Sequence, residues 1–389
     1  MAKASPPFDA HQLLKALKKL PEPATYWAGF SGGADSSALL HALHEIRTHL
    51  KSDIRVLHVN HGIHKHSDDW EQHCRQVSDN LGLELEVRRV EVRNDRGSGV
   101  EAEARRQRYL AVEEVLKEGD IFLTAHHRED QAETLLLNLV RGSGVDGLAG
   151  MPEVRPIGRG TLARPLLSFS MESLRHYLEA RNLGWLEDPS NMDLSLDRTF
   201  VRHRLLPLMS ERWPGVSERM AKSADLSRLA SNSISGWTRQ QLEDQLAHPR
   251  VLELENLDPG CSTFSMLIRQ WLKNTEAPPL PARQLNELAL QCRRPGTDSQ
   301  LCISWQEWSI RKFDNRLWLQ ETTNSNEFKP LNWAQAGPVG LGRFMGTLNL
   351  DPKPDHWPDD LQVHTRLGGE SMLCIGGTIH KSLKDNCRE

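Results

Sequence analysis

The sequence lacks the patterns that would assign it to a membrane, to the secreted proteins or to the metal-cluster proteins. No apolar run approaches the roughly 18 residues that a membrane-spanning helix requires. The opening segment MAKASPPFDAHQLLKALKKL has no apolar core or cleavage site of a signal peptide, and we expect a short amphipathic helix there. The six cysteines include no C-x-x-C pair and are expected to be free thiols. These absences predict a cytoplasmic protein with no membrane partner.

An excess of basic charge is also missing. The formal net charge is −4 at pH 7, so any contact with RNA must come from local basic patches rather than from the whole surface. A chain of 389 residues is longer than one ordinary core supports, which predicts two or three domains. Internal repeats and low-complexity tracts are absent from the sequence as well.

What the sequence contains is a strict alternation of strand-like and helix-like segments between residues 24 and 141. The strand-like segments are TYWAGF, IRVLHV, LEVRRVEV and IFLTA, and the helix patterns lie at about 35–50, 66–82, 100–118 and 129–141. This alternation predicts a doubly wound parallel sheet of the α/β class. In such sheets ligands bind beyond the carboxyl ends of the strands.

The pattern changes after this sheet. Residues 142–165 are rich in Gly, Pro and Arg and are expected to be irregular, whereas 168–212 has an interrupted helical pattern. The pattern is helical from 215 to about 300, and 301–320 predicts a hairpin that turns at Asp314-Asn315. We therefore expect three domains: an α/β domain over 1–214, a mostly helical domain over 215–325, and a small α+β domain over 326–389.

The segment FSGGADSS, which follows the first strand, is a glycine-rich turn that opens a helix, and such a turn suits an anion. A Walker A loop is excluded because the sequence contains no Gly-Lys dipeptide. The segment GSGVDG at 142–147 matches the Rossmann fingerprint by letter, but it follows a helix pattern rather than a strand, so we interpret it as a loop. A phosphate loop at 31–36 is the remaining interpretation, with an ordinary serine-capped turn as the alternative.

The loop Ser31-Gly32-Gly33-Ala34-Asp35-Ser36 resembles the SGGxDS loop of the PP-loop ATP pyrophosphatases. It is followed, in order, by HVNHGIHKHS, VEAEARRQRY, TAHHREDQAET, RGSG, RPLL, EDPSN and RTFVRHRLLPLM. In this order the motifs resemble the tRNA(Ile)-lysidine synthetase family, closely over about residues 24 to 215 and more loosely beyond. The resemblance implies that ATP adenylates the C2 oxygen of the wobble cytidine in a CAU anticodon with release of pyrophosphate. Free L-lysine then displaces AMP.

The resemblance also implies an ATP and Mg²⁺ site. The residues implied for ATP are those of the loop (Ser31, Gly32, Gly33, Ala34, Asp35 and Ser36) together with His61 and His126. Asp35 and Asp130 follow two strands and are the expected Mg²⁺ pair, because AMP transfer builds negative charge on phosphate oxygens. The histidines at 58, 61, 64, 66 and 73 lack the paired cysteines and closed ligand set of a zinc site.

Three further residues are candidates for the chemistry. Arg105 and Arg108 share a face of the helix expected over 100–118 and by resemblance would face the α-phosphate or the cytidine; a solvated, salt-bridged helix face is the alternative. Glu133 is a candidate base or orienter for the lysine amine, although acidity near a helix N-terminus is an alternative explanation. The family usually has two consecutive aspartates where this chain has Glu129-Asp130, so only Asp130 is taken from the motif.

RNA contacts are expected from arginines that lie near the end of the ATP domain. These are Arg164, Arg198, Arg202 and Arg204; a packed helix with an arginine-rich outer face is compatible with the same pattern. The implied partners are the isoleucine tRNA with a CAU anticodon and free L-lysine, and a homodimer is left open. The segment from Val363 to Glu389 resembles the start of the family's final small domain. We expect that domain to be incomplete and the residues from about 340 to be loosely docked.

Three rival functions remain to be weighed. A tRNA 2-thiolase of the same superfamily would need cysteine or iron–sulfur ligands in the ATP domain, where Cys74 is the only cysteine before residue 215. An amidotransferase or ligase for a small molecule would need a partner domain that the pattern does not show. A catalytically impaired tRNA-binding relative is disfavoured by the intact loop and by Asp130.

Overall fold

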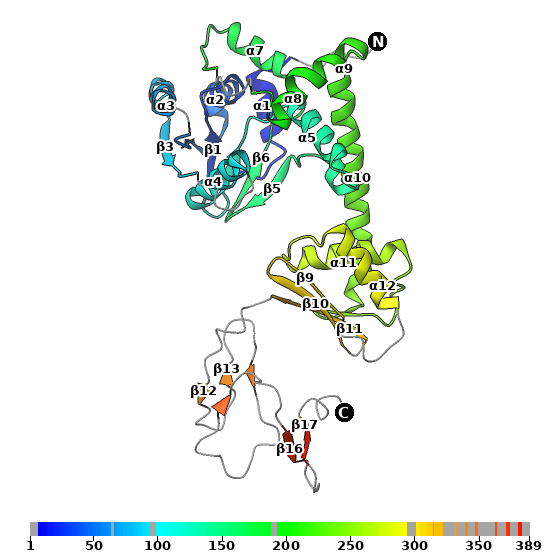
Figure 1. Ribbon diagram of the computed structural model, residues 1–389. Coiled ribbons are helices and arrows are strands. Elements are labelled where there is room, and N and C mark those ends of the chain that lie inside the picture. The colour runs from blue at the N-terminus through cyan, green and yellow to red at the C-terminus, as the bar shows by residue number, and fades with distance from the viewer. Residues whose placement is uncertain are drawn as a thin grey trace. The chain divides into compact units, whose positions relative to one another are not determined.

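The computed structural model describes residues 7–63, 66–92, 99–187, 193–293, 301–313 and 315–321, with short strand segments between 331 and 382. The chain divides into two units, residues 1–234 and 235–389 (Figure 1). The division falls within the long helix α10 (Val216–Glu243), whereas the sequence analysis expects a boundary just before this helix.

The first unit is built around a six-stranded sheet with the strand order β3-β2-β1-β4-β6-β5. The strands are β1 (Thr25–Gly29), β2 (Asp53–Asn60), β3 (Glu84–Arg89), β4 (Ile121–Leu123), β5 (Val154–Ile157) and β6 (Gly160–Ala163). Neighbouring strands from β3 to β6 are parallel, and β5 is antiparallel to β6. The predicted parallel α/β sheet is thus confirmed, with all four predicted strands in it.

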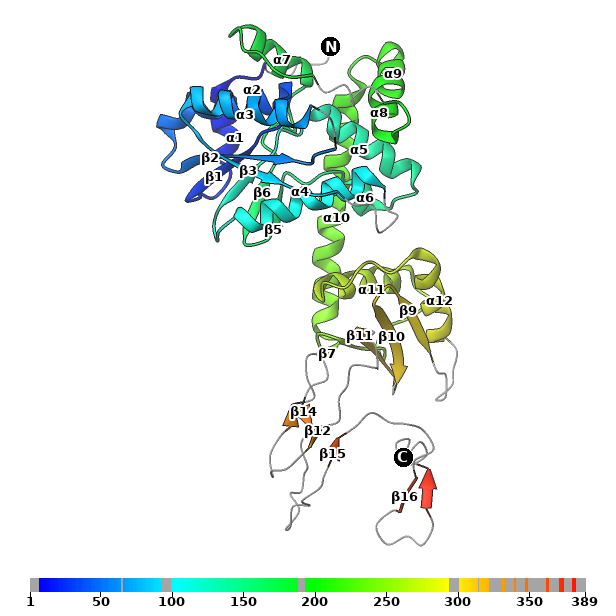
Figure 2. The same cartoon turned by 60° about the vertical axis from the view of Figure 1, so that its left-hand side comes forward.

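Helices cover both faces of this sheet. The helices of the first unit are α1 (Ala10–Leu17), α2 (Ala34–Ile46), the 3-10 turn η1 (Arg47–His49), α3 (Ser67–Leu81), α4 (Val100–Val115), α5 (Arg128–Val140), α6 (Val145–Leu148), α7 (Met171–Glu179), α8 (Asp197–Phe200), the π turn η3 (Val201–Leu205) and α9 (Leu206–Arg212). The predicted N-terminal amphipathic helix is confirmed as α1, whose apolar face is buried. Figure 2 shows α4 on the opposite side of the sheet from α2.

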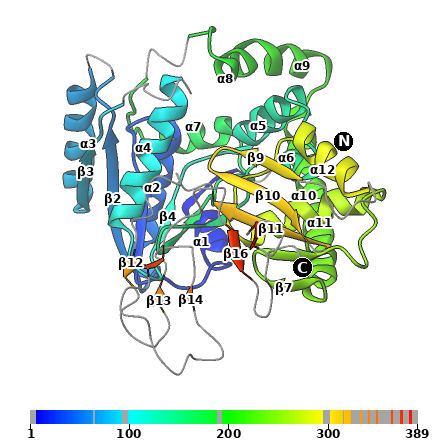
Figure 3. The ribbon, with the colours of Figure 1, turned by 60° about the horizontal axis from the view of Figure 1, so that its bottom comes forward.

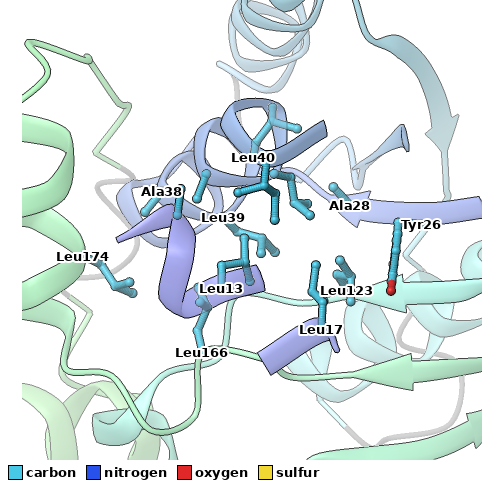
Figure 4. Packing of buried hydrophobic residues seen from close by; sticks show 14 of the residues in the cluster. Leu13, Leu17, Tyr26, Ala28, Ala38, Leu39, Leu40, Leu123, Leu166 and Leu174 are labelled. Carbon is cyan, nitrogen blue, oxygen red and sulfur yellow. The ribbon is translucent and has the colours of Figure 1, made fainter. Parts of the chain in front are cut away.

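Two cores result from the two faces, because successive side chains of a strand point to opposite sides. In β1, Tyr26 and Ala28 join the core under α1, α2 and α7, whereas Trp27 joins the core under α4. Figure 4 shows the first of these cores, in which Leu39 of α2 lies near Leu13 of α1. Strands with both faces buried are strongly apolar, which explains why the sequence pattern locates them.

Residues 142–165 are a correction to the sequence analysis, which expects irregular structure there. The segment contains α6 and the hairpin of β5 and β6, and β6 extends the parallel sheet next to β4. Each of these strands has four residues, too few for a clear period. Gly158, at φ +52°, lies in the turn between them and is one of the glycines on which the expectation of irregular structure rested.

The second unit contains a five-stranded antiparallel sheet with the order β7-β8-β11-β10-β9, seen with β9, β10 and β11 side by side in Figure 3. Its elements are β7 (Leu246–His248), β8 (Val251–Glu253), α11 (Ser262–Asn274), α12 (Ala282–Arg293), β9 (Cys302–Trp305), β10 (Trp308–Phe313) and β11 (Arg316–Glu321). The predicted hairpin is confirmed, since Phe313 pairs with Arg316 across the turn. The helical pattern did not signal β7 and β8, which have three residues each.

Only short strands are described in the last part of the chain. They are β12 (Leu331–Asn332), β13 (Val339–Gly340), β14 (Thr347–Leu348), β15 (Gln362–Val363), β16 (Ser371–Leu373) and β17 (His380–Ser382). The predictions of an incomplete final domain and of loose docking from about residue 340 therefore lie mostly outside the described residues. Within the described part of the chain, no helix is both long and apolar enough to span a membrane.

Candidate active site

The carboxyl ends of β2, β1, β4 and β6 lie along one edge of the sheet, because these neighbouring strands are parallel. The chain places β2 and β3 on one side of β1, and then β4 and β6 on the other side. The pair β1 and β4 is therefore the switch point of the sheet, where ligands of doubly wound folds bind. The phosphate loop follows β1 and residues 124–130 follow β4, so both predicted segments meet at this point.

The phosphate loop leads from β1 into the N-terminus of α2. Gly32 has a φ of +84°, and a Cβ there would lie 3.2 Å from Leu186 Cδ1, so both backbone and space favour glycine. The Ser36 hydroxyl donates to the Gly33 carbonyl at 3.0 Å and accepts from the Ser31 N–H at 3.2 Å. These bonds hold the loop in shape at the N-terminus of a 13-residue helix, which is a favourable site for an anion.

Asp35 and the buried His127 connect the two segments. His127 Nε2 lies 3.5 Å from Asp35 Oδ2 and 3.4 Å from Asp130 Oδ2, while Nδ1 lies 3.0 Å from Glu129 Oε2. Burial by itself lowers the pKa of His127, but Asp130, Asp35 and Glu129 outweigh burial and raise this pKa to about 10. Sequence reasoning chose His126 and passed over His127, because only tertiary structure places three carboxylates around one of two adjacent histidines.

Asp35 and Asp130, the expected Mg²⁺ ligands, differ in whether a carboxylate oxygen is free to bind a cation. Asp35 suits a hard cation, since its Oδ1 is buried without a hydrogen-bond partner at the mouth of the phosphate loop. Both oxygens of Asp130 already accept hydrogen bonds, Oδ2 from the His127 N–H and Oδ1 from Arg198 and Arg202. In the described ranges, no group of three or more His, Cys, Asp or Glu residues is arranged to hold a metal ion. Asp35 is accordingly the better candidate ligand.

Arg198 and Arg202 point into the site rather than away from it. Arg198 donates to Glu133 Oε2 at 2.8 Å and to Asp130 Oδ1 at 2.9 Å. Arg202 donates to both oxygens of Glu133 and to Asp130. Glu133 is fully buried, and the guanidinium groups of both arginines are paired with carboxylates. The RNA contacts expected from Arg198 and Arg202 stay a prediction.

A hollow of about 570 Å³ lies on the β2 and β3 side of the loop and is lined in part by Asn60, His61 and Gly62. His61 Nδ1 is buried without a partner, and its Nε2 lies 3.4 Å from Arg108 Nη2. Burial and the charge of Arg108 lower the pKa of His61 to about 4, so its imidazole is neutral at pH 7. Burial likewise lowers the pKa of His126 to about 3, although Asp130 opposes this effect.

The other predicted arginines occupy different environments. Arg105 is exposed on α4 and stacks on Tyr109, whereas Arg204 is exposed on η3. Arg164 is only 3% exposed and donates to the Pro152 carbonyl at 2.7 Å. Arg164 directly follows β6 and lies beneath the surface, and its predicted RNA contact stays a prediction.

Cys74 is buried beside the phosphate loop. A Cβ on Gly32 would lie 3.5 Å from its Sγ, and burial raises the pKa of this thiol to about 12. A thiol with so high a pKa is a poor nucleophile and a poor metal ligand at pH 7. Cys74 is therefore not a reactive cysteine next to the phosphate loop.

This chain is similar to known proteins along most of its length. A PP-loop domain matches residues 8–209, and a TilS substrate binding domain matches residues 264–318. A tRNA(Ile)-lysidine synthase of Xanthomonas campestris is 37% identical over 93% of this chain and 84% of its own length. One from Alkalilimnicola ehrlichii is 38% identical over 80% of this chain and 70% of its own length. Among solved structures, the U34-tRNA thiolase NcsA from Methanococcus maripaludis matches 56% of this chain and 78% of that chain, with 17% identity and a TM-score of 0.45. The identity and coverage of the two synthases show that this chain belongs to the tRNA(Ile)-lysidine synthase family.

Proposed function

We propose that this protein is an ATP-dependent ligase that converts the wobble cytidine of the CAU-anticodon isoleucine tRNA to lysidine. The observation that carries the proposal is the buried, unpartnered Asp35 Oδ1 at the mouth of an intact phosphate loop. Such a carboxylate beside an anion site is suited to a cation that neutralises phosphate oxygens. Family membership indicates the substrate class. We propose a cytoplasmic location for the protein, where ATP, tRNA and L-lysine are all available.

In the first step the phosphate loop binds the pyrophosphate part of ATP through its hydroxyl and N–H groups. The hollow beside His61 accommodates the adenosine, since it lies on the side of the loop away from β4. Mg²⁺, held by Asp35, would neutralise charge on the phosphates when bound. Arg105 and Arg108 remain candidates for the α-phosphate or the cytidine, and α4 places both side chains at the surface.

In the second step L-lysine attacks the adenylated cytidine and AMP leaves. Glu133 is better suited to positioning than to proton transfer, because its oxygens already accept three hydrogen bonds from Arg198 and Arg202. The two guanidinium groups are thereby held rigidly next to Asp130. We propose that this cluster orients the reactants rather than serving as a free base.

A 2-thiolase is the strongest rival from the same superfamily. It would need a reactive sulfur or an iron–sulfur cluster near ATP, and Cys74, with its raised pKa, does not provide one. The described geometry therefore favours the lysidine reaction.

The proposal is tested with purified protein, ATP, Mg²⁺, L-lysine and a CAU anticodon stem-loop. AMP formation and incorporation of labelled lysine should both require the RNA, and an otherwise identical UAU stem-loop should accept no lysine. Asp35→Asn should lower AMP formation at least about 100-fold, because a charge-stabilising contact to the phosphates is lost. Asp53→Asn is the matched control, since Asp53 is exposed at the amino end of β2. RNA-dependent AMP formation without lysine incorporation would reject the proposed product.

A further inference from the structure

The structure contains a second group of arginines, which lies on other elements than the Arg198 and Arg202 pair. Tyr109 of α4 lies at its centre, with the guanidinium carbon of Arg155 4.7 Å and that of Arg105 5.5 Å from the ring centroid. Arg105 also donates to the Tyr109 hydroxyl at 3.4 Å. The positive charges of Arg105, Arg164 and Arg155 outweigh burial and lower the pKa of this hydroxyl. Three arginines from α4, β5 and the end of β6 therefore converge on one phenol ring.

Within the described residues, this cluster has no paired carboxylate. In the part of the chain that the structure describes, none of Arg105, Arg155 and Arg164 has a carboxylate at ion-pair distance. Arg164 is 3% exposed, and its Nε is buried without a hydrogen-bond partner. Like charges packed together without an acid repel one another, and an unpaired buried donor costs free energy. Both costs are removed when an anion binds.

The position of the cluster indicates which anion it receives. Arg164 follows β6, which is separated from β1 by β4 alone. Two strand spacings place the end of β6 about 10 Å along the edge from the phosphate loop. The hollow proposed for adenosine lies on the opposite side, at β2 and β3. ATP thus occupies the edge from β3 to β1, and the β6 side is left for the second substrate.

We propose that Tyr109, Arg105, Arg155 and Arg164 form an anion-binding corner that receives a backbone phosphate of the RNA next to the wobble cytidine. The inference rests on the proposed function for the identity of the RNA. Arg105 is exposed, Tyr109 and Arg155 are half-buried, and Arg164 is buried, so the corner has an open mouth and a charged floor. Planar guanidinium forks match phosphate oxygens, and contacts of this kind position a nucleotide without reading its sequence.

The test is a binding titration of the full chain with the CAU stem-loop over a range of salt concentrations, without ATP or lysine. Arg155→Gln removes a charge from the corner at a half-exposed position where folding is not at risk. We expect its RNA affinity to fall about tenfold and the slope of log K against log salt to decrease by about one. Arg106→Gln is the matched control, because Arg106 lies on the same helix but is paired with Glu103 at 2.6 Å. It should leave both quantities unchanged.

A second arm identifies the phosphate. Stem-loops are prepared that carry a neutral methylphosphonate at single positions around the cytidine. At one of these positions the replacement should weaken binding to the wild-type protein but should not weaken binding to Arg155→Gln any further. If every position weakens both proteins equally, the corner does not hold an RNA phosphate. Loss of ATP affinity in Arg155→Gln with unchanged RNA affinity would assign the corner to ATP and overturn the proposal.

Because binding requires no turnover, the two proposals can fail separately. A corner that responds as expected in a protein that forms no lysidine would leave the inference standing and reject the function. Lysidine formation with normal RNA binding by Arg155→Gln would reject the corner alone.

Discussion

Glu133 and Arg198, separated by 65 residues in the chain, form a partly buried ion pair in which Arg198 Nε donates to Glu133 Oε2 at 2.8 Å. Arg202 completes the cluster from one turn further along the same helical segment, and Asp130 accepts from both arginines. The cluster joins α5, which follows the central strand β4, to the segment α8 and η3. It therefore fixes residues 197–205 against the candidate active site.

Glu133→Ala should destabilise the protein, because the substitution leaves two partly buried guanidinium groups without their main partner. We expect the free energy of unfolding, measured by urea denaturation, to fall by about 3 kcal/mol. Asp225→Ala is the matched control. It breaks the Asp225–Arg228 pair at 2.8 Å, whose carboxylate is 61% exposed, and pairs with an exposed carboxylate contribute about 1 kcal/mol or less. If both variants lose the same free energy of unfolding, the Glu133 cluster stabilises the fold no more than an ordinary surface ion pair does.

Gly32→Ala should impair both stability and ATP binding. A non-glycine residue at φ +84° is strained by about 1–2 kcal/mol, and the new methyl group would press against Leu186 and His73. Gly33→Ala is the control for stability, since Gly33 has an ordinary φ of −74° and a Cβ there would meet only ordinary contacts. Thermal unfolding and ATP titration of both variants measure the difference. A Gly32→Ala protein with the wild-type melting temperature would contradict the strained turn.

Glu71 should make stability depend on pH in the acid range. This carboxylate is buried, but hydrogen bonds from Arg89, Asn60 and Arg75 outweigh the burial and lower its pKa to about 2. A group whose pKa is lower in the folded state contributes stability above its unfolded pKa of about 4.5, and the contribution is lost as pH falls from there toward 2. Its size should be on the order of 2 kcal/mol, since Arg75 and Arg89 are more than half exposed.

The measurement compares wild type with Glu71→Gln by denaturant unfolding between pH 7 and pH 3. The difference between the two proteins should shrink steadily below about pH 4.5. A constant difference over this range would show that the Glu71 charge does not stabilise the fold.

Arg204 and Arg202 should separate RNA binding from stability. Arg204 is exposed and no described carboxylate is paired with it, so Arg204→Ala should lower the salt slope of tRNA binding by about one without changing the melting temperature. Arg202→Ala should instead lower stability, because Glu133 and Asp130 lose a buried partner. Salt-dependent binding and thermal unfolding of both variants give the comparison. The reverse pattern would place the RNA path at Arg202.

Local features of the sequence were sufficient for the first four strands of the sheet, the phosphate loop and the family. Buried parallel strands are short apolar runs, and a glycine–serine turn needs only residues 31–36 to define its backbone and its hydrogen bonds. The hairpin of β5 and β6 escaped prediction because four-residue strands carry almost no period.

Tertiary structure alone decided which charges meet. Nothing within a few residues of Arg164 indicates that it is buried beside Tyr109, and nothing near Arg198 indicates that Glu133 accepts its hydrogen bond. Nor does the His126-His127 pair reveal which imidazole lies between Asp35 and Asp130. The physical reason is that secondary structure depends on neighbours a few residues apart. Burial and ion pairing depend on segments that parallel strands bring to one edge of the sheet from tens of residues away.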